Sequence, residues 1–306
     1  MLTYAAATLA GFILLVWGAD RFVLGAGGTA RNLGVPPLLI GLTLVGMATS
    51  GPEIFVSVVA ALGDEPELAM GNAIGSNIAN IALVLGTTAL VMPIVIRSAT
   101  LRREMPALLA VTLLLVMVFL NRTITRPEGL LLLMGLVVLM YWLIVLSSRF
   151  DPADPITAEI EAEIPANIPM VSSVAWLVVG LVVLLAGSNL LVWGAHNVAE
   201  AMGVSDLVIG LTLVAVGTSF PELAVSIVSA LKQEHDLALV VGLAAAIRPA
   251  TLEPELLTLH LPVMIGVTLM LFAIAYNLSG KSRIGRLEGA VLLASFFAYH
   301  GYLALR

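Results

Sequence analysis

The residues with the clearest chemical potential form a short polar group inside an apolar stretch, Leu42 to Leu62. Glu53 is a carboxylate with about ten largely apolar residues on each side. Thr49, Glu53 and Ser57 share one helical face because they are spaced four residues apart. An ionisable group so deep in a membrane span is costly and is therefore interpreted as functional. The alternative is a structural ion pair with an arginine elsewhere in the bundle.

The backbone around this carboxylate is also predicted to supply oxygen ligands. Pro52 removes one backbone donor and Gly51 loosens the helix, so that carbonyl groups between residues 46 and 49 can be freed. Carboxylate, hydroxyl and carbonyl oxygens are hard ligands, which Na⁺ and Ca²⁺ prefer to nitrogen or sulfur. The stretch therefore predicts a site for a hard cation within the membrane.

A second copy of the stretch lies 169 positions later. Between 34–62 and 203–231, 18 of 29 positions are identical. The shared positions include the polar pairs Thr49/Thr218, Ser50/Ser219 and Glu53/Glu222 and the proline pair Pro52/Pro221. Two identical broken-helix segments, each with a buried carboxylate, indicate two halves of one site.

A second motif, GNAIGSNIAN, occupies 71–80. Asn72, Ser76 and Asn80 are again spaced four residues apart and form a polar stripe on an apolar helix. A seam of small residues that packs against another helix is the alternative interpretation. Because the motif lies on the predicted span next to that of Glu53, we favour ligation of an ion.

Composition places these motifs in a membrane protein. Of 306 residues, 60% are hydrophobic and 11% are charged, which is typical of a helical integral membrane protein. There is no cysteine, which excludes disulfides and thiol chemistry. The sequence has neither a basic patch nor a glycine-rich phosphate loop, and its four histidines form no HExxH motif. Nucleic-acid binding and enzyme catalysis are therefore not expected.

Apolar runs predict an all-α transmembrane protein with ten spans, five on each side of a polar, acidic linker. An odd number of spans in each repeat makes the second copy enter from the opposite side, which gives two inverted-topology repeats of five helices. We assign the first repeat to 1–147, the linker to 148–169 and the second repeat to 170–306. The predicted spans are 4–26, 35–61, 68–95, 105–120, 128–147, 171–195, 204–231, 237–249, 257–277 and 286–304.

Lysine and arginine predict the orientation in the cell (inner) membrane. With the N-terminus outside, nine basic residues fall on the inner side and four on the outer side, which fits the excess of positive charge in inner loops. Both termini are therefore expected outside and the linker inside.

The motifs TSGPE, GNAIGSNIAN and GTSFPE resemble the repeats of the calcium/cation antiporter superfamily, in particular those of prokaryotic sodium/calcium exchangers. The resemblance covers the whole chain and departs from the family pattern at Ala48 and Gly51. It implies ion ligation by Thr49, Ser50, Glu53, Ser76, Asn80, Thr218, Ser219 and Glu222, with carbonyl ligands for Na⁺ at Gly46 and Ala215. It implies Ca²⁺ and Na⁺ as transported ions, with no cofactor and no required oligomer.

The expected function is exchange of Ca²⁺ for Na⁺ by alternating access around a site in the middle of the membrane. Two carboxylates balance one Ca²⁺, and an empty dianionic site is heavily penalised in hydrocarbon, so that transport in each direction needs an ion. The resemblance implies that the first and sixth helices slide against the others. A Ca²⁺/H⁺ antiporter and a gated cation channel are the alternatives.

The second half departs from the resemblance near residue 243, where a second GNxxGSNIxN is expected and is absent. Gly242 can be aligned in two ways: the residues before it match the approach to Gly71, and the residues after it match those after Gly86. About 15 residues are therefore missing relative to the first half. The remnant, 237–247, is ~11 residues and cannot cross ~30 Å of hydrocarbon as a helix.

Complete loss of this span would turn over the last two helices and bring their basic residues outside. We therefore expect about 15 further residues after Val241 or Gly242, with polar groups opposite Ser76 and Asn80. If the protein contains these residues but the printed sequence omits them, the structure should show a chain break at this point. A continuous chain of 32.0 kDa would instead leave only half of a site.

Overall fold

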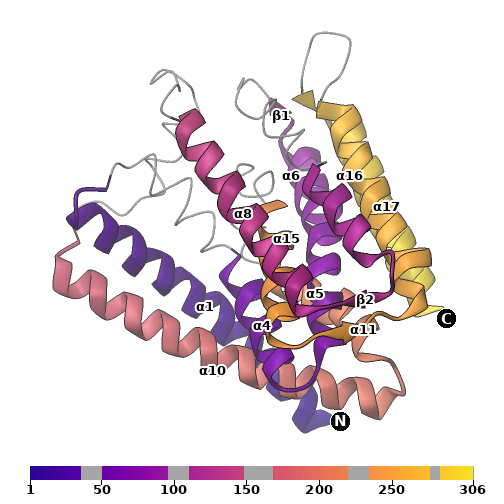
Figure 1. Cartoon of the computed structure of the whole chain (residues 1–306), viewed down its shortest axis with the longest axis horizontal. Helices are drawn as coiled ribbons and strands as arrows, with labels where there is room; N and C mark the ends of the chain where they lie inside the picture. Colours follow the sequence, from indigo (N-terminus) through magenta and orange to yellow (C-terminus); the bar gives the residue numbers. More distant parts are fainter. Residues whose placement is uncertain (36–49, 96–109, 148–167, 220–233, 276–282, 306) are drawn as a thin grey trace.

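The computed structural model describes residues 1–35, 50–95, 110–147, 168–219, 234–275 and 283–305, which form a helical bundle (Figure 1). The described elements of the first half are α1 (Leu2–Asn32), α4 (Gly51–Leu62), α5 (Pro66–Ile78), the π-helix η2 (Ala79–Leu85), α6 (Gly86–Val91), β1 (Ile94–Val95), a helix at Ala110–Phe119, β2 (Thr123–Ile124) and α8 (Arg126–Ser147). Those of the second half are α10 (Met170–Met202), α11 (Asp206–Ile209), the π-helix η3 (Gly210–Val214), α12 (Ala215–Thr218), α15 (Glu234–Ile247), β3 (Ala250–Thr251), the π-helix η4 (Leu256–His260), α16 (Leu261–Ala275), β4 (Arg283–Ile284) and α17 (Arg286–Ala304).

Each of the ten predicted spans contains a helix within the described residues. Four helical stretches there are long and apolar enough to cross a membrane: 2–32, 66–91, 170–202 and 256–274. The all-helical fold and its two repeats are thus confirmed.

Helices α1 and α10 pack side by side along their lengths in opposite directions (Figure 1). Gly11, Gly18 and Gly25, spaced seven residues apart, lie against the backbone of Leu191, Leu184 and Leu177 in that order. A Cβ at Gly11 would come within 2.7 Å of the Leu191 nitrogen. Because lipid provides no hydrophobic drive for helix association, such close approach of small residues holds the two helices together.

Two short antiparallel strand pairs relate the halves by a pseudo-two-fold axis. β1 follows α6 and pairs with β4, with Ile94 opposite Ile284. β3 follows α15 and pairs with β2, with Ile124 opposite Ala250. Each pair therefore joins the end of the third helix of one repeat to the start of the fifth helix of the other, as an inverted repeat requires.

Both termini lie at one end of the bundle. At this end α1 meets the last turns of α10, the α4–α5 turn meets the end of α15, and the start of α16 meets the end of α17. The side-chain contacts that show this are Tyr4 with Trp193, Asp64 with Arg248, and His260 with Tyr299. β3, which follows α15, pairs with β2, which precedes α8, so α15 ends on the side of the bundle where α8 starts. The last two helices are therefore not turned over.

The expected chain break after Val241 or Gly242 is wrong, because α15 runs without interruption from Glu234 to Ile247. The tertiary contacts also decide which residue of the first repeat corresponds to Gly242. A Cβ at Gly289 would meet the Gly86 carbonyl oxygen at 2.8 Å, and one at Gly129 would meet the Gly242 carbonyl oxygen at 2.8 Å. Gly242 is thus the counterpart of Gly86 and not of Gly71.

The strand pairs measure how much shorter the second half is. Ile94 and Ala250 occupy equivalent places, yet 41 positions separate Glu53 from Ile94 and only 28 separate Glu222 from Ala250. The second copy is therefore 13 residues shorter, close to the expected 15. The described part of α15 has 14 residues, or ~21 Å.

Candidate ion-binding site

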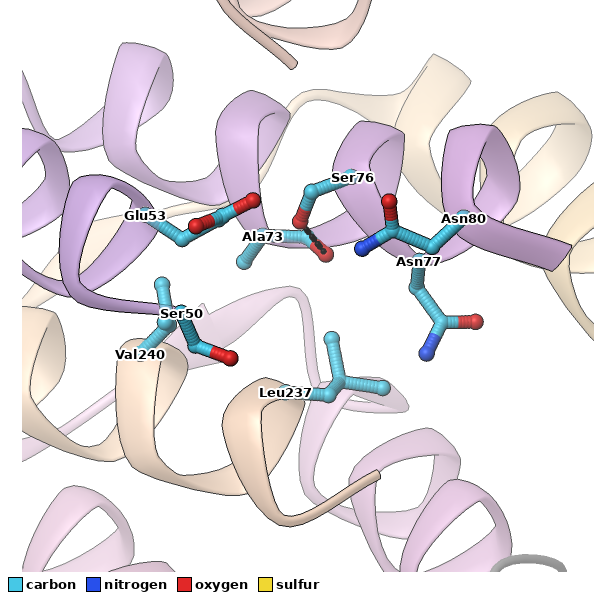
Figure 2. A pocket seen from close by; sticks show the side chains of 8 residues that line it. All are labelled: Ser50, Glu53, Ala73, Ser76, Asn77, Asn80, Leu237 and Val240. Atoms are coloured by element: carbon cyan, nitrogen blue, oxygen red, sulfur yellow. Dashed lines mark hydrogen bonds between the residues drawn. The ribbon is translucent and has the colours of Figure 1, made fainter. Parts of the chain in front are cut away.

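A small cavity lies where α4, α5, η2 and α15 meet. It has room for about one water-sized occupant, a size that also suits a dehydrated metal ion. Figure 2 shows polar side chains of the first half around it, with two apolar side chains of α15 facing them. The lining residues are Ser50, Glu53, Ala73, Ser76, Asn77, Asn80, Leu237 and Val240.

Among the described residues that line this cavity, Glu53 is the only carboxylate, and it is 2% exposed. It lies in the first turn of α4, which begins at Gly51 with Pro52 as one of its first residues. Proline is tolerated there because the first backbone N–H groups of a helix have no partner within it. The positive end of the helix dipole favours the charged carboxylate at this position.

Asn72 connects the two halves beside this carboxylate. Its Nδ2 donates to the Glu53 carbonyl oxygen at 3.2 Å and to Ser57 Oγ at 3.0 Å. Its Oδ1 accepts a hydrogen bond of 3.2 Å from Thr218 Oγ1. The side chain is fully buried, so it fixes α4 relative to both α5 and α12.

The structure brings four of the predicted ligands to one cavity: Ser50, Glu53, Ser76 and Asn80. Thr218 is joined to this group through Asn72 and does not line the cavity. At the end of α12 the Ala215 carbonyl accepts hydrogen bonds from the hydroxyls of Thr218 and Ser219, at 3.2 and 2.8 Å. The predicted ligands Gly46, Thr49 and Glu222 lie outside the described residues.

Asn77 lines the cavity but was not among the predicted ligands. The four-residue spacing of Asn72, Ser76 and Asn80 predicted a single stripe of ligands, and Asn77 lies outside that spacing. The structure divides that stripe, because Asn72 faces α4 and Thr218 whereas Ser76 and Asn80 face the cavity with Asn77. The next positions on a cavity-facing helix, i+3, i+4 and i+7 from Ala73, are the signal that identifies these three residues.

Among the described side chains that line the cavity, those opposite Ser76 and Asn80 are apolar, so the expected polar groups are not found among them. Leu237 and Val240 of α15 lie there (Figure 2). The physical reason is the shortened second repeat: 13 residues are absent between Glu222 and Ala250, the stretch that corresponds to the one carrying Ser76 and Asn77 in the first repeat.

The register set by Gly242 identifies a further residue. With Gly242 equivalent to Gly86, the segment DLALVVG of α15 aligns with NIALVLG of the first half. Asp236 then occupies the position in α15 that Asn80 occupies in η2. The similarity of these two segments was visible in the sequence, but it competed with the match to the approach to Gly71.

Comparison with known proteins identifies the family. A model of the sodium/calcium exchanger family matches this chain twice, over residues 3–145 and 172–305, which together make up most of the sequence. The chain belongs to the sodium/calcium exchanger family. The two matches follow the two repeats of the fold, and the family and fold are those of a transporter.

Relatives and solved structures of similar length agree. CaxA of Alkalimonas amylolytica, a proposed antiporter, is 43% identical over 312 positions, covering 98% of both chains. The inner membrane protein YrbG of Escherichia coli is 34% identical over 314 positions, covering 98% of this chain and 96% of its own. A structure of the sodium-calcium exchanger NCX_Mj, soaked with Na⁺ and Sr²⁺, matches with a TM-score of 0.63 at 28% identity over 98% of both chains.

Two conclusions follow from these comparisons. Membership in this family, together with the likeness to the exchanger structure, supports cation antiport involving Ca²⁺ as the activity. The alignments with CaxA and YrbG are longer than the 306 residues of this chain, so each of these two relatives contains residues that have no counterpart here. This agrees with the shortened second repeat.

Proposed function

We propose that this protein exchanges Ca²⁺ for Na⁺ by alternating access, at a site in the middle of the membrane built on Glu53 and Glu222. The observation that carries this proposal is the nearly complete burial of Glu53 among the oxygen-bearing side chains of Ser50, Ser76 and Asn80. A carboxylate at this depth is stabilised by a bound cation, a proton or a fixed partner.

The chemistry of the lining favours a hard cation. Its described residues offer carboxylate, hydroxyl and amide oxygens, and none of them carries a nitrogen base or sulfur. Within the described residues, the Oδ1 atoms of Asn77 and Asn80 are buried and accept no hydrogen bond. Buried carbonyl oxygens of this kind are costly unless they meet a donor or a cation. With Glu222 as the second carboxylate, the two charges balance one Ca²⁺.

The fold supplies the elements that alternating access needs. Thr218 reaches Asn72, which holds the Glu53 backbone, so both repeats contribute to the same place. The long α1–α10 pair, held by small residues, forms a unit that can move as a body against the remaining helices. An empty, doubly charged site would oppose this movement in hydrocarbon, which couples the movement to ion binding.

A Ca²⁺/H⁺ antiporter is the second candidate, and Asp236 is the observation that favours it. By its position in the sequence of α15 this residue aligns with Asn80, so the second repeat carries one more titratable carboxyl group than the two-glutamate site needs. One Ca²⁺ needs only two negative charges, and a third carboxylate within the membrane can be kept neutral by a proton.

Transport in proteoliposomes separates the candidates. Vesicles loaded with Na⁺ and diluted into Na⁺-free buffer with ⁴⁵Ca²⁺ should take up Ca²⁺, with a membrane current if more than two Na⁺ leave per Ca²⁺. Vesicles with a pH gradient and no Na⁺ should not. Uptake that follows the pH gradient and ignores Na⁺ would establish the proton-coupled alternative. No uptake in either case would mean that the shortened second repeat leaves the site inactive.

A further inference from the structure

Three side chains from distant parts of the chain converge at the end of the bundle that holds both termini. His196 Nδ1 lies 2.9 Å from Glu65 Oε2 and 3.0 Å from Asp206 Oδ1, with Asp206 Oδ2 at 3.2 Å. One ligand atom from each residue falls within 4.8 Å of those of the other two. Two carboxylates thus share a single ring nitrogen.

Each of the three comes from a different element. Glu65 immediately precedes α5 in the turn that follows α4, His196 lies near the end of α10, and Asp206 is the first residue of α11. The side chains are partly buried, with 18%, 37% and 22% of their surfaces exposed. The backbone therefore presents them to one another, while one side of the cluster remains open to solvent.

The cluster has an excess of negative charge. Burial, and after it the neighbouring Asp206, raises the pKa of Glu65 to about 7, although His196 acts in the opposite direction. Within the described residues no lysine or arginine pairs with these carboxylates, and the nearby Arg248 is engaged by Asp64 at 2.9 Å. The single hydrogen on His196 Nδ1 cannot satisfy both carboxylates fully. A bound cation would relieve this repulsion.

We propose that Glu65, His196 and Asp206 bind one divalent transition-metal ion, such as Zn²⁺. Ligand atoms at the usual Zn–N and Zn–O lengths of ~2.1 Å stand ~3.4 Å apart around a tetrahedral ion. The observed separations from the ring nitrogen are 2.9 to 3.2 Å, so the side chains need to move apart by only a few tenths of an ångström. The exposed side leaves room for water as the fourth ligand.

The chemistry of this site differs from that of the transport cavity. Imidazole nitrogen suits Zn²⁺, Ni²⁺ or Co²⁺, whereas Ca²⁺ and Na⁺ prefer sites made only of oxygen. Glu53 lies in the first turn of α4 and Glu65 lies beyond its end, so the helix from Glu53 to Leu62, ~14 Å long, separates the two places. The proposed ion is therefore a separate ligand and not a second transported ion.

Metal binding at this place would strengthen the connection between three parts of the fold. The ion would tie α10, the partner of α1, to the α4–α5 turn and to α11. Because the ion binds only the assembled ends of these elements, it should raise the thermal stability of the protein. This consequence does not depend on transport.

Titration of the purified protein in detergent tests the proposal. Calorimetry with Zn²⁺ should give one site per chain, and Co²⁺ should give the visible absorption of a low-symmetry complex. His196→Asn, Glu65→Gln and Asp206→Asn should each weaken Zn²⁺ binding by at least ~10-fold, the scale on which even outer-shell partners affect metal affinity. Asp64→Asn is the matched control, because Asp64 neighbours Glu65, is largely exposed and pairs with Arg248; it should bind as the parent protein does.

Size-exclusion profiles and metal-free melting temperatures check that each variant is folded. If His196→Asn binds Zn²⁺ like the parent protein, if Asp64→Asn weakens binding equally, or if no Zn²⁺ binds at one per chain, the proposal is wrong. The double variant Glu53→Gln, Glu222→Gln separates this test from that of the proposed function. It should lose transport and keep Zn²⁺ binding; loss of Zn²⁺ binding in this variant alone would place the ion in the transport cavity and overturn the proposal.

Discussion

Thr218 Oγ1 donates a hydrogen bond of 3.2 Å to Asn72 Oδ1, joining residues that are 146 positions apart in the chain. Both side chains are at most 1% exposed. The amide group of Asn72 in turn holds the main-chain carbonyl of Glu53 at 3.2 Å. The position of the buried carboxylate in the first repeat is thus set in part by a hydroxyl of the second.

This relationship predicts energetic coupling between the two residues. Asn72→Ala and Thr218→Val should each lower the stability by ~1–3 kcal/mol, because each leaves buried polar partners unsatisfied. The double variant should be less destabilised than the sum of the two, by ~1 kcal/mol, since the shared bond can be lost only once. Unfolding in detergent, followed by tryptophan fluorescence, measures this cycle; fully additive losses would contradict the coupling.

The two-glutamate site predicts the most severe losses of transport. Glu53→Gln or Glu222→Gln should abolish Ca²⁺ uptake in proteoliposomes, because one remaining carboxylate cannot balance a desolvated divalent ion. Ser50→Ala and Ser219→Ala should reduce uptake less, since a hydroxyl supplies one neutral ligand. Near-normal uptake by either glutamine variant would rule out the proposed site.

The contact of Gly129 with Gly242 is equivalent to that of Gly289 with Gly86, which predicts similar effects of substitution on stability. Gly129→Ala and Gly289→Ala should both lower the melting temperature, because the new Cβ would meet backbone atoms of α15 or α6 at 2.7 to 3.1 Å. We expect ~1–3 kcal/mol for each, the usual cost of overpacking. Gly266→Ala is the control, since its added Cβ would have no heavy atom of another described element within 4 Å. A loss at Gly289 without one at Gly129 would argue against the assigned register of α15.

The same register predicts a role for Asp236 in transport. Asp236→Asn should lower the rate of Ca²⁺ exchange and change its dependence on pH, because it removes a titratable carboxylate at the position equivalent to Asn80. Glu234→Gln, two positions earlier in α15, is the matched control for loss of one negative charge. Equal effects of the two substitutions would remove the special status of Asp236.

Much of this molecule follows from local sequence patterns. Apolar runs predict the ten spans, because a segment that crosses a bilayer forms a helix that satisfies its own backbone hydrogen bonds and exposes apolar side chains to lipid. The repeat at a distance of 169 positions predicts the inverted halves, and the isolated Glu53 within an apolar stretch predicts a buried carboxylate. The spans and the buried carboxylate depend on residues close together in the sequence, where helical periodicity decides which side chains share a face. The repeat needs only the comparison of two stretches of the sequence.

Only the tertiary structure decided the remaining features. In the sequence, the residues around Gly242 resemble two different segments of the first half; the packing of Gly242 against Gly129 selects one of them. Likewise, no local pattern connects Glu65 with His196 and Asp206, which are brought together by the meeting of three helix ends. Contacts of this kind depend on how helices from both repeats pack, and that packing is a property of the whole chain.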